Sequence, residues 1–285
     1  MKKILLFGAT GMAGHVAYHY LKQTREYDIR NVVYRKKLNQ DSIIIDVTNK
    51  EAVTHLILEQ KPDIIINCIG VLIKGSKTHP DNAIYINAYL PHLLKRLADD
   101  INAKLIHIST DCVFTGKKGG YTESDFKDAD DIYGRSKALG EIDNDKDLTI
   151  RTSIIGPELK NEGEGLFHWF MNQEGSVNGF TKVIWGGVTT VELAKAIHIA
   201  IKQNVKGLVH LSNGISISKY NLLQLFNKIY RNNSIIINSF EGTQCDKSIT
   251  KSDLFLYEVP SYETMLNEMY HWMKLHSELY DGKYL

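Results

Sequence analysis

The sequence is poor in the features that mark secreted, membrane-spanning and metal-binding proteins. It has 3 cysteines among 285 residues, and Cys68, Cys112 and Cys245 lie too far apart for a metal or redox motif. We therefore expect reduced thiols in a cytoplasmic protein. No apolar run approaches the ~20 residues that a membrane-spanning helix needs. The N-terminal apolar run ends at Gly8, which is too early for a signal peptide.

The charges are balanced, and no metal-binding pattern is present. Lysine and arginine number 34 and aspartate and glutamate number 33, which gives a net charge of +1. Such a balance indicates neither a nucleic-acid partner nor a membrane surface. The 11 histidines include no H-E-x-x-H spacing, so we expect no metal site. With 43% hydrophobic and 24% charged residues, the composition is typical of a soluble protein with a sizeable core.

The chain does begin with the pattern of a strand, a glycine-rich turn and a helix. The apolar run over 3–7 predicts a strand buried on both faces, and a helical pattern follows the turn Gly8-Ala-Thr-Gly-Met-Ala-Gly14. In this context the first two glycines let the backbone approach a pyrophosphate, and the third lets helix and strand pack closely. Free N–H groups at the helix start suit phosphates. The expected dinucleotide contacts in this turn are Gly8, Thr10, Gly11, Met12 and Gly14.

The end of the second expected strand, 31–34, indicates which dinucleotide is bound. An NAD site has a carboxylate at this point for the ribose hydroxyls, whereas an NADP site has cations for the 2′-phosphate. The chain has Arg35-Lys36-Lys37 and no acid there, so we favour NADPH over the alternative of a solvated basic loop. The other cofactor contacts are expected where the third and fourth strands, 42–46 and 63–68, end. The predicted contacts are Arg35, Lys36, Asp46, Val47, Cys68 and Gly70.

The segment 80–100 has helical spacing but contains Pro91. Proline cannot donate to the carbonyl four residues earlier, which belongs to Asn87. One interpretation is a kinked helix whose free Asn87 carbonyl holds a water on a proton path to Lys137. The other is that one helix ends near Leu90 and a new one starts at Pro91.

Tyr133 and Lys137 are the candidate catalytic side chains. Their spacing of four puts both on one face of a helix. An ammonium beside the phenol lowers the tyrosine pKa from about 10, so that the phenol can exchange a proton with a substrate oxygen at neutral pH. The fifth expected strand, 104–109, ends nearby, and either Thr110 or Ser109 could hydrogen-bond the same oxygen.

Alternating strands and helices up to the sixth expected strand, 148–152, predict a parallel sheet covered by helices. Asp128, Asp130 and Asp131 suit the cap and dipole at the start of the Tyr133 helix. Beyond residue 152 the pattern loosens into a polar loop, several helices and two strands. We predict an α/β fold, with a Rossmann-like doubly wound parallel sheet in residues 1–155. A smaller, mostly helical substrate lobe follows in residues 156–285, with some segments returning to the first domain.

Three motifs occur in order: G-A-T-G-M-A-G at 8–14, S-T-D-C-V-F-T-G at 109–116 and Y-G-R-S-K-A-L-G-E at 133–141. Together they resemble the extended short-chain dehydrogenase/reductase family, and within it the dTDP-4-dehydrorhamnose reductases and related nucleotide-sugar 4-keto reductases. The likeness continues through 151–153, 188–196 and 262–273, and it therefore covers nearly the whole chain.

The resemblance implies a catalytic triad of Thr110, Tyr133 and Lys137, with Lys137 also holding the cofactor. It implies an NADPH-dependent reductase of a nucleotide-linked 4-keto-6-deoxyhexose in surface-polysaccharide synthesis, with the nucleotide sugar bound in the C-terminal lobe. The rhamnose enzymes usually have tyrosine after S-T-D, where this chain has Cys112. Together with I-N-C-I-G at 66–70, this is similar to a branch that acts on UDP-linked N-acetylated sugars. Both UDP-N-acetyl and dTDP sugars therefore stay open as substrates.

Two other functions also stay open. One is a catalytically silent NADP-binding regulatory protein on the same fold, which need not retain Tyr133 and Lys137. The other is a nucleotide-sugar epimerase or 4,6-dehydratase, but the dehydratases carry an Asp-Glu pair after the strand-five threonine, where this chain has Asp111-Cys112. Besides the nucleotide-sugar substrate, the partner that we expect is a second copy of the chain in a homodimer.

Overall fold

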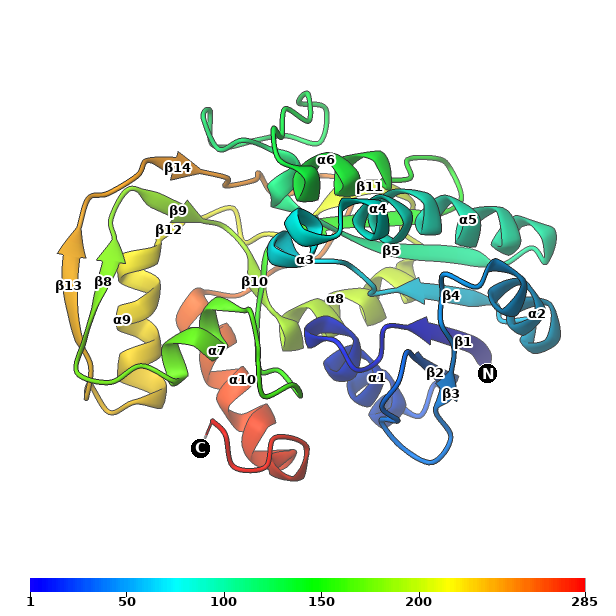
Figure 1. Ribbon diagram of the computed structural model, residues 1–285, viewed down its shortest axis with the longest axis horizontal. Helices are drawn as coiled ribbons and strands as arrows, with labels where there is room; N and C mark the ends of the chain where they lie inside the picture. The colour runs from blue at the N-terminus through cyan, green and yellow to red at the C-terminus, as the bar shows by residue number, and fades with distance from the viewer. Residues whose placement is uncertain (285) are drawn as a thin grey trace.

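The computed structural model describes residues 1–284 and shows a large sheet domain beside a smaller lobe (Figure 1). The strands of the large sheet are β1 (Lys2–Phe7), β2 (Tyr27–Val33), β3 (Ile43–Ile44), β4 (Ile64–Asn67), β5 (Lys104–Thr110), β6 (Leu148–Thr152) and β11 (Gly207–His210). They are all parallel, in the order β11-β6-β5-β4-β1-β2-β3. This order reverses direction next to β1, and the predicted doubly wound parallel sheet is confirmed.

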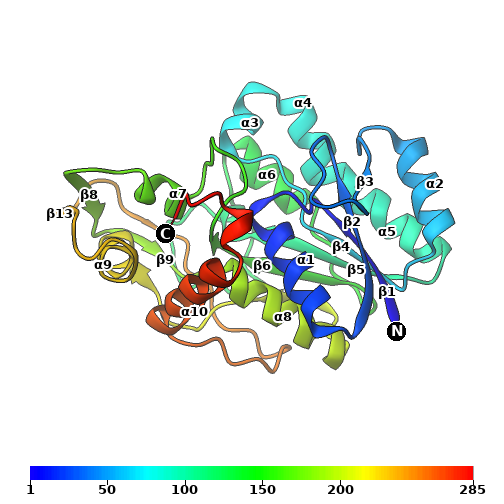
Figure 2. The same ribbon diagram turned by 90° about the horizontal axis from the view of Figure 1, so that it is seen from below.

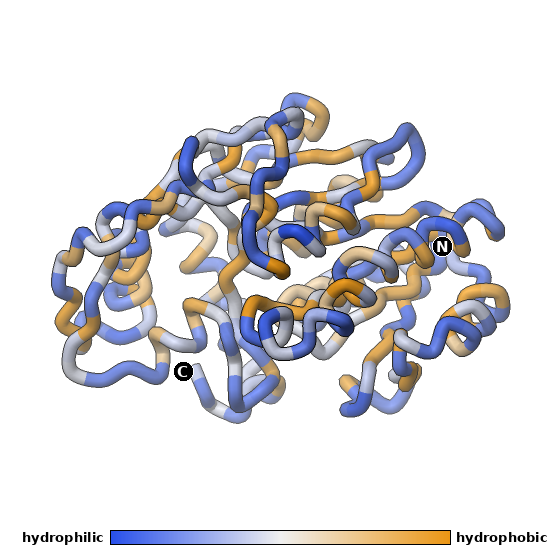
Figure 3. Tube along the Cα trace, turned by 45° about the horizontal axis from the view of Figure 1, so that its top comes forward, coloured by the Kyte–Doolittle hydropathy of each residue, from blue (hydrophilic) through white to orange (hydrophobic). Residues whose placement is uncertain are grey.

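Helices cover both faces of this sheet, as Figure 2 shows. One face carries α1 (Met12–Thr24) and α8 (Thr190–Gln203), and the other carries α2 (Lys50–Gln60) and α5 (Leu90–Asp100). Side chains of β1 alternate between the two cores, with Ile4 and Leu6 on the α1 side and Leu5 and Phe7 on the α2 side. Figure 3 shows apolar stretches of the trace interrupted by polar ones throughout the molecule. The short apolar run predicted a strand buried on both faces, and that prediction is confirmed.

The second and third strands differ in length from the expected ones. The second begins at Tyr27, four residues before the expected start, because Tyr27 and Ile29 point into the core while Asp28 and Arg30 stay exposed. Because charged residues alternate with these apolar ones, the apolar run that predicted the strand covers only its second half. The third is reduced to Ile43–Ile44 because it lies at the edge of the sheet and pairs only with Val32 and Val33.

The chain is helical without a break from Pro80 to Asp100. It passes from α4 (Pro80–Ala83) through a π-helical turn, η1 (Ile84–Tyr89), into α5. Within it the Leu90 N–H donates to the carbonyl of Tyr85, five residues back. The wider turn accommodates Pro91, which has no N–H to donate. The interpretation that a helix ends near Leu90 and another starts at Pro91 is therefore wrong.

The C-terminal lobe combines helices with short strands. Its helices are α7 (Leu166–Met171), α9 (Lys219–Tyr230), α10 (Tyr262–Leu275) and the 3-10 turn η3 (Ser277–Leu279). Its strands form the pairs β7 (Ile154–Ile155) with β10 (Val188–Thr189) and β8 (Ser176–Phe180) with β13 (Ile236–Phe240), and the group β9 (Val183–Trp185), β12 (Ile217–Ser218) and β14 (Cys245–Asp246). The lobe is less helical than expected, because strands of two to five residues are too short to show a period in the sequence.

Two segments after residue 155 return to the large domain, as expected: α8 packs on α1, and β11 extends the sheet beside β6. The boundary between residues 155 and 156 stays a prediction. In the described part of the chain, no helix is both long and apolar enough to cross a bilayer.

The turn between β1 and α1 depends on two of its glycines. Gly8 has φ +84°, a conformation that other residues avoid. A Cβ on Gly14 would lie 2.1 Å from the carbonyl oxygen of Gly8. The helix can therefore approach the strand this closely only if position 14 has no side chain, as the motif predicts.

Gly14→Ala should therefore destabilise the fold by about 2 kcal/mol or more, because the opposing atom is backbone and cannot rotate away. The free energy of unfolding in urea measures this. Gly70→Ala is the matched control, because its Cβ would meet only Asn87 Oδ1 at 3.7 Å. Equal stabilities of the two variants would contradict this account of the turn.

Candidate active site

Tyr133 and Lys137 lie on α6 (Ile132–Leu139), which packs against the carboxyl end of β5. Asp131 caps this helix by accepting a hydrogen bond from the Gly134 N–H at 2.8 Å, so the expected capping role of Asp131 is confirmed. The Lys137 ammonium is buried and donates to the carbonyl of Ile108 at 2.7 Å. This bond ties the helix to the strand that ends at Thr110.

Thr110, rather than Ser109, is the hydroxyl that accompanies Tyr133. Side chains alternate along β5, and Ser109 points the other way, where its hydroxyl donates to Glu141 Oε1 at 2.6 Å. The Thr110 hydroxyl accepts from the Cys112 N–H at 3.1 Å and donates to Asp111 Oδ1 at 3.2 Å. It also lies close enough to Tyr133 to stabilise the phenolate by hydrogen bonding.

Burial governs the pKa values of the catalytic pair. It lowers the pKa of Lys137 from 10.5 to about 8, although the Glu141 carboxylate acts in the opposite direction. Burial also raises the pKa of Tyr133 above its ordinary value, and the Cys112 thiol adds to this effect while Thr110 opposes it. The expected lowering of the Tyr133 pKa by Lys137 is not found, because burial has the largest effect on the phenol and raises its pKa. At neutral pH the phenol keeps its proton, as a proton donor must.

His107 lies beside Lys137 and Asn67 lies beside His107, so both extend this site. The sequence analysis missed both. His107 Nε2 lies 3.4 Å from the Lys137 ammonium, and His107 Nδ1 lies 3.2 Å from Asn67 Nδ2. Burial, followed by the Lys137 charge, holds the pKa of His107 well below its usual range. The imidazole is therefore neutral beside the ammonium. A polar side chain inside each of two apolar strands was the available signal.

Asn87 is a further buried residue, of which the sequence analysis considered the carbonyl but not the side chain. Its side-chain amide donates to the Val71 carbonyl at 3.0 Å and to Ser136 Oγ at 3.1 Å, and its oxygen accepts from the Val71 N–H at 2.9 Å. It thus joins the π-helical turn, the loop after β4 and α6. A polar residue on the apolar helix stripe with Leu90 and Leu94 was the signal for it.

The β1–α1 turn suits a dinucleotide pyrophosphate. Gly11 caps α1 without any side-chain hydrogen bond, so the first N–H groups of the helix are open to an anion. Thr10 is half-buried in this turn, and the Met12 side chain extends to Gly165 of the lobe. The first N–H groups of α1 have no side-chain acceptor, and Gly8 lets the backbone turn tightly in front of them. This arrangement fits a pyrophosphate.

The predicted contacts after β3 and β4 lie at the same edge of the sheet. Val47 is buried, and Asp46 accepts hydrogen bonds from the Thr48 N–H and hydroxyl at 2.9 and 2.7 Å. Cys68 follows β4 close to Lys137, and burial raises the pKa of its thiol to about 12. A Cβ on Gly70 would make only an ordinary contact, with Asn87 Oδ1 at 3.7 Å.

Arg35 and Lys36 are exposed at the end of β2. The Arg35 guanidinium stacks over the Tyr34 ring at 4.5 Å and donates to its hydroxyl at 3.0 Å. After the Thr48 hydrogen bonds, the Arg35 charge also lowers the pKa of Asp46. The expectation that no acid competes at this point is therefore wrong, because β3 runs beside β2 and its end brings Asp46 near Arg35.

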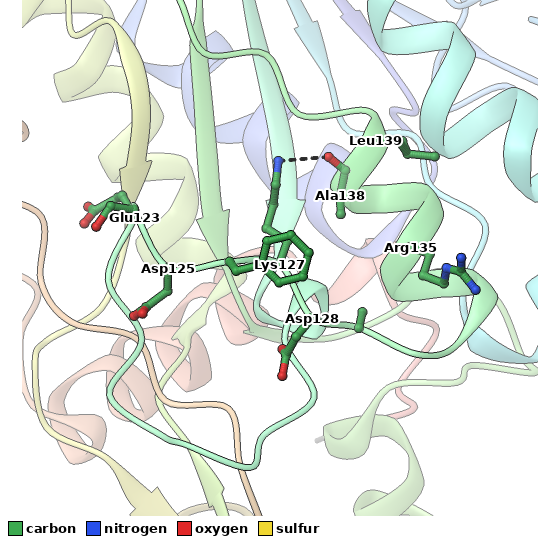
Figure 4. A pocket seen from close by; sticks show the side chains of 10 residues that line it. Glu123, Asp125, Lys127, Asp128, Arg135, Ala138 and Leu139 are labelled. Carbon is green, nitrogen blue, oxygen red and sulfur yellow. Dashed lines mark hydrogen bonds between the residues drawn. The ribbon is translucent and has the colours of Figure 1, made fainter.

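A surface hollow lies on the opposite side of α6, between that helix and residues 123–129 (Figure 4). Arg135 and Leu139 line it, and the Lys127 ammonium donates to the Ala138 carbonyl at 3.2 Å. Positions 135 and 139 point away from positions 133 and 137 on a helix. The hollow is therefore separate from the catalytic face. Among residues 1–284, no group of three His, Cys, Asp or Glu side chains could hold a metal ion.

Residues 1–252 match the family model for the RmlD substrate binding domain. The chain belongs to this family. Its fold resembles dTDP-4-dehydrorhamnose reductase from Bacillus anthracis, solved in complex with NADP, with a TM-score of 0.81, 25% identity and coverage of 95% of this chain and 99% of that one. The resemblance that the three motifs indicated is thereby confirmed.

Two curated relatives in this family have different names. The dTDP-4-dehydrorhamnose reductase of Salmonella typhimurium is 27% identical over 224 residues, which cover 74% of this chain and 72% of that protein. Methionine adenosyltransferase 2 subunit beta of Mus musculus is 30% identical over 141 residues, or 49% of this chain. That match spans only 42% of the mouse protein, less than half of its length. Membership of the RmlD family therefore leaves the activity to be argued from the site.

The burial of Lys137 predicts a pH-dependent stability. Its pKa is about 8 in the folded chain and 10.5 when solvated, so the unfolded chain binds more protons between these values and stability rises with pH across them. Below pH 8 the buried charge of Lys137 lowers the free energy of unfolding, and Lys137→Met removes this charge. The variant should therefore be more stable relative to wild type at pH 7 than at pH 10, by roughly 2–3 kcal/mol.

Urea unfolding at the two pH values measures this difference. The exposed Lys182→Met, at a surface ion pair with Glu241, is the control and should differ from wild type by the same amount at both pH values. A Lys137→Met difference that is independent of pH would show that the ammonium carries no such cost.

Proposed function

We propose that the protein is an NADPH-dependent reductase of a nucleotide-linked 4-keto-6-deoxyhexose, either a UDP-N-acetyl or a dTDP sugar, in surface-polysaccharide precursor synthesis. The observation that carries this proposal is that α6 packs on β5 with the Lys137 ammonium bonded to the Ile108 carbonyl, which brings Tyr133 and Lys137 to the strand end that carries Thr110. The relatives named dTDP-4-dehydrorhamnose reductase and the NADP complex of one of them support the substrate class and the cofactor.

The residues that would hold the cofactor surround the carboxyl edge of the sheet. The glycine turn and the open start of α1 would bind the pyrophosphate, and Arg35 and Lys36 would bind the 2′-phosphate. Lys137 would hold the nicotinamide ribose. When bound, the cofactor supplies a hydride to the ketone carbon.

The chain's own residues then manage the proton. Tyr133 donates its phenolic proton to the ketone oxygen, which becomes a strongly basic alkoxide as the hydride arrives. Thr110 donates a hydrogen bond to the developing oxyanion, for which its hydroxyl must turn from Asp111 Oδ1 toward the substrate. Thr110, whose hydrogen bond acts to lower the Tyr133 pKa, also favours the phenolate that remains.

The alternatives fit the site less well. A catalytically silent regulatory protein does not need Thr110 at the end of β5 to lie beside Tyr133 and Lys137 on α6. A dehydratase needs a base for the C5 proton and an acid for the departing hydroxyl. At the second position of the dehydratase pair this chain has Cys112, and burial raises the pKa of that thiol to about 12, followed in effect by the Asp111 charge.

Product analysis separates reduction from dehydration. With a 4-keto-6-deoxy sugar linked to UDP or dTDP, we expect one NADPH oxidised for each sugar reduced. With UDP-N-acetylglucosamine or dTDP-glucose we expect no loss of water, because Cys112 cannot replace a carboxylate. Mass spectrometry and NMR of the products measure both. A 4-keto product formed from either parent sugar without NADPH consumption would overturn the reductase proposal.

Tyr133→Phe retains the ring and removes the proton donor. Turnover should fall by about 100-fold or more, the range for a positioned general acid, while NADPH binding measured by fluorescence is retained. Tyr89→Phe is the control, because the Tyr89 side chain is 41% exposed on the π-helical turn. Near-normal turnover of Tyr133→Phe would mean that another group supplies the proton.

Replacing both Arg35 and Lys36 by alanine should weaken NADPH far more than NADH, because only NADPH carries the 2′-phosphate. The loss should be about tenfold or more in the apparent constant for NADPH. Arg96→Ala, on the exposed side of α5, is the matched control. Equal weakening of NADPH and NADH would remove these two residues from the phosphate site.

A further inference from the structure

Residues 245–250, here called the strap, connect the lobe to the loop that follows β5. The strap begins as β14, which pairs with β9 of the lobe, and then runs toward the large sheet (Figure 1). Its Asp246 N–H donates to the Gly116 carbonyl at 2.8 Å, and its Ser248 carbonyl accepts from the Tyr121 N–H at 2.9 Å. Backbone hydrogen bonds therefore hold the strap against loop 115–121, close to the catalytic end of β5.

The strap packs so closely that it determines where Lys247 lies. Gly116 has φ +85°, and a Cβ there would stand 3.0 Å from Lys247 Cγ and 2.6 Å from Cys245 Sγ. The stem of Lys247 thus rests on the Gly116 backbone. Loop 115–121 directly follows η2 (Asp111–Val113) and Phe114, and the Lys247 charge reaches the Asp111 carboxyl group, whose pKa it acts to lower.

Lys247 shares its charged neighbours with Tyr133. Cys112, Asp111 and Asp131 affect the pKa of the Lys247 ammonium, and the same three groups affect the pKa of the Tyr133 phenol. Lys247 is also the cation whose charge acts on the buried Asp111 carboxylate. The same groups therefore lie within electrostatic range of both Lys247 and Tyr133, and Cys112 packs against the helix of Tyr133, since a Cβ on Gly134 would lie 2.2 Å from the Cys112 carbonyl oxygen.

The Lys247 ammonium has hydrogen-bond donors that a ligand in this part of the site could use. Lys247 is half-buried, and among residues 1–284 no hydrogen bond or ion pair to its ammonium is found. An ammonium carries three N–H donors, and leaving them unpaired in a partly buried site is unfavourable. A ligand oxygen bound beside Tyr133 would satisfy them.

We propose that Lys247 is a substrate-binding residue whose ammonium donates to an oxygen of the sugar ring or its substituent. This inference rests on the proposed function, since the ligand is the nucleotide sugar of that site. A diphosphate is the less suitable partner at this position, because Asp111 and Asp131 would repel its charge. The neutral oxygens of a sugar meet no such repulsion.

Calorimetric titration of the full chain with bound NADPH tests this with matched ligands: UDP against UDP-N-acetylglucosamine, and dTDP against dTDP-glucose. Lys247→Met should weaken the sugar nucleotide that wild type binds by about 10-fold or more, and leave the diphosphate alone within twofold. Lys247→Arg should restore most of the affinity. Lys251→Met is the control, because its ammonium pairs with Glu258 at the surface.

Three results would overturn the inference. One is unchanged sugar-nucleotide affinity in Lys247→Met, and another is equal weakening of diphosphate and sugar nucleotide, which would place the ammonium at the diphosphate. The third is a wild type that binds the sugar nucleotide no more tightly than the diphosphate. Thermal unfolding of Lys247→Met within a few degrees of Lys251→Met would show that the strap is intact, and if it is not, Lys247→Gln replaces Lys247→Met.

The binding assay is independent of turnover, so the two proposals can fail separately. If Lys247→Met loses sugar affinity while wild type reduces no 4-keto sugar, the reductase proposal fails and the inference stands. If wild type turns over and Lys247→Met has the same kcat/KM and the same sugar affinity, the inference fails and the reductase proposal stands.

Discussion

The hydrogen bond from the buried Lys137 ammonium to the Ile108 carbonyl determines the geometry of the whole site. An ammonium buried this deeply needs an acceptor, and the carboxyl end of a parallel strand offers one. Tyr133 is four residues before Lys137 on the helix, and Thr110 is two residues after Ile108 on the strand. Because the helix repeats at about four residues and the strand at two, one bond aligns both hydroxyl groups on the same side.

The neighbouring helix is held in place by three residues that act together. Pro91 cannot donate to the Asn87 carbonyl, and a Cβ on Gly140 would lie 1.9 Å from that oxygen, so the carbonyl is turned toward the end of α6. The Asn87 amide meanwhile bonds to Ser136 on the same helix. The close approach of the two helices thus requires a glycine, a proline and a buried amide at these positions. The water on the Asn87 carbonyl stays a prediction.

The sequence predicted what depends on local periodicity and missed what depends on neighbours across the sheet. The apolar run 3–7, the glycine turn and the helix that follows it carry their own signals, and the structure has them where the sequence placed them. The competition of Asp46 with Arg35 depends on β2 and β3 lying side by side, which no spacing in the chain reveals. The pKa of Tyr133 depends on burial, and the position of Lys247 depends on a strap more than 100 residues away from the β5 loop.

Burial favours the uncharged form of each titratable side chain in this site, and a neutral phenol suits the reduction of a ketone. It keeps protons on the Tyr133 phenol and the Cys112 thiol and favours their loss from Lys137. A neutral phenol has a proton to give to an alkoxide, whereas elimination of water needs an ionised base beside the sugar. The carboxylate nearest the triad, Asp111, is itself buried with a raised pKa, and the hydroxyl of Thr110 already donates to it. A site whose carboxylate is engaged and whose phenol is protonated is equipped to complete a ketone reduction rather than to remove a proton from carbon.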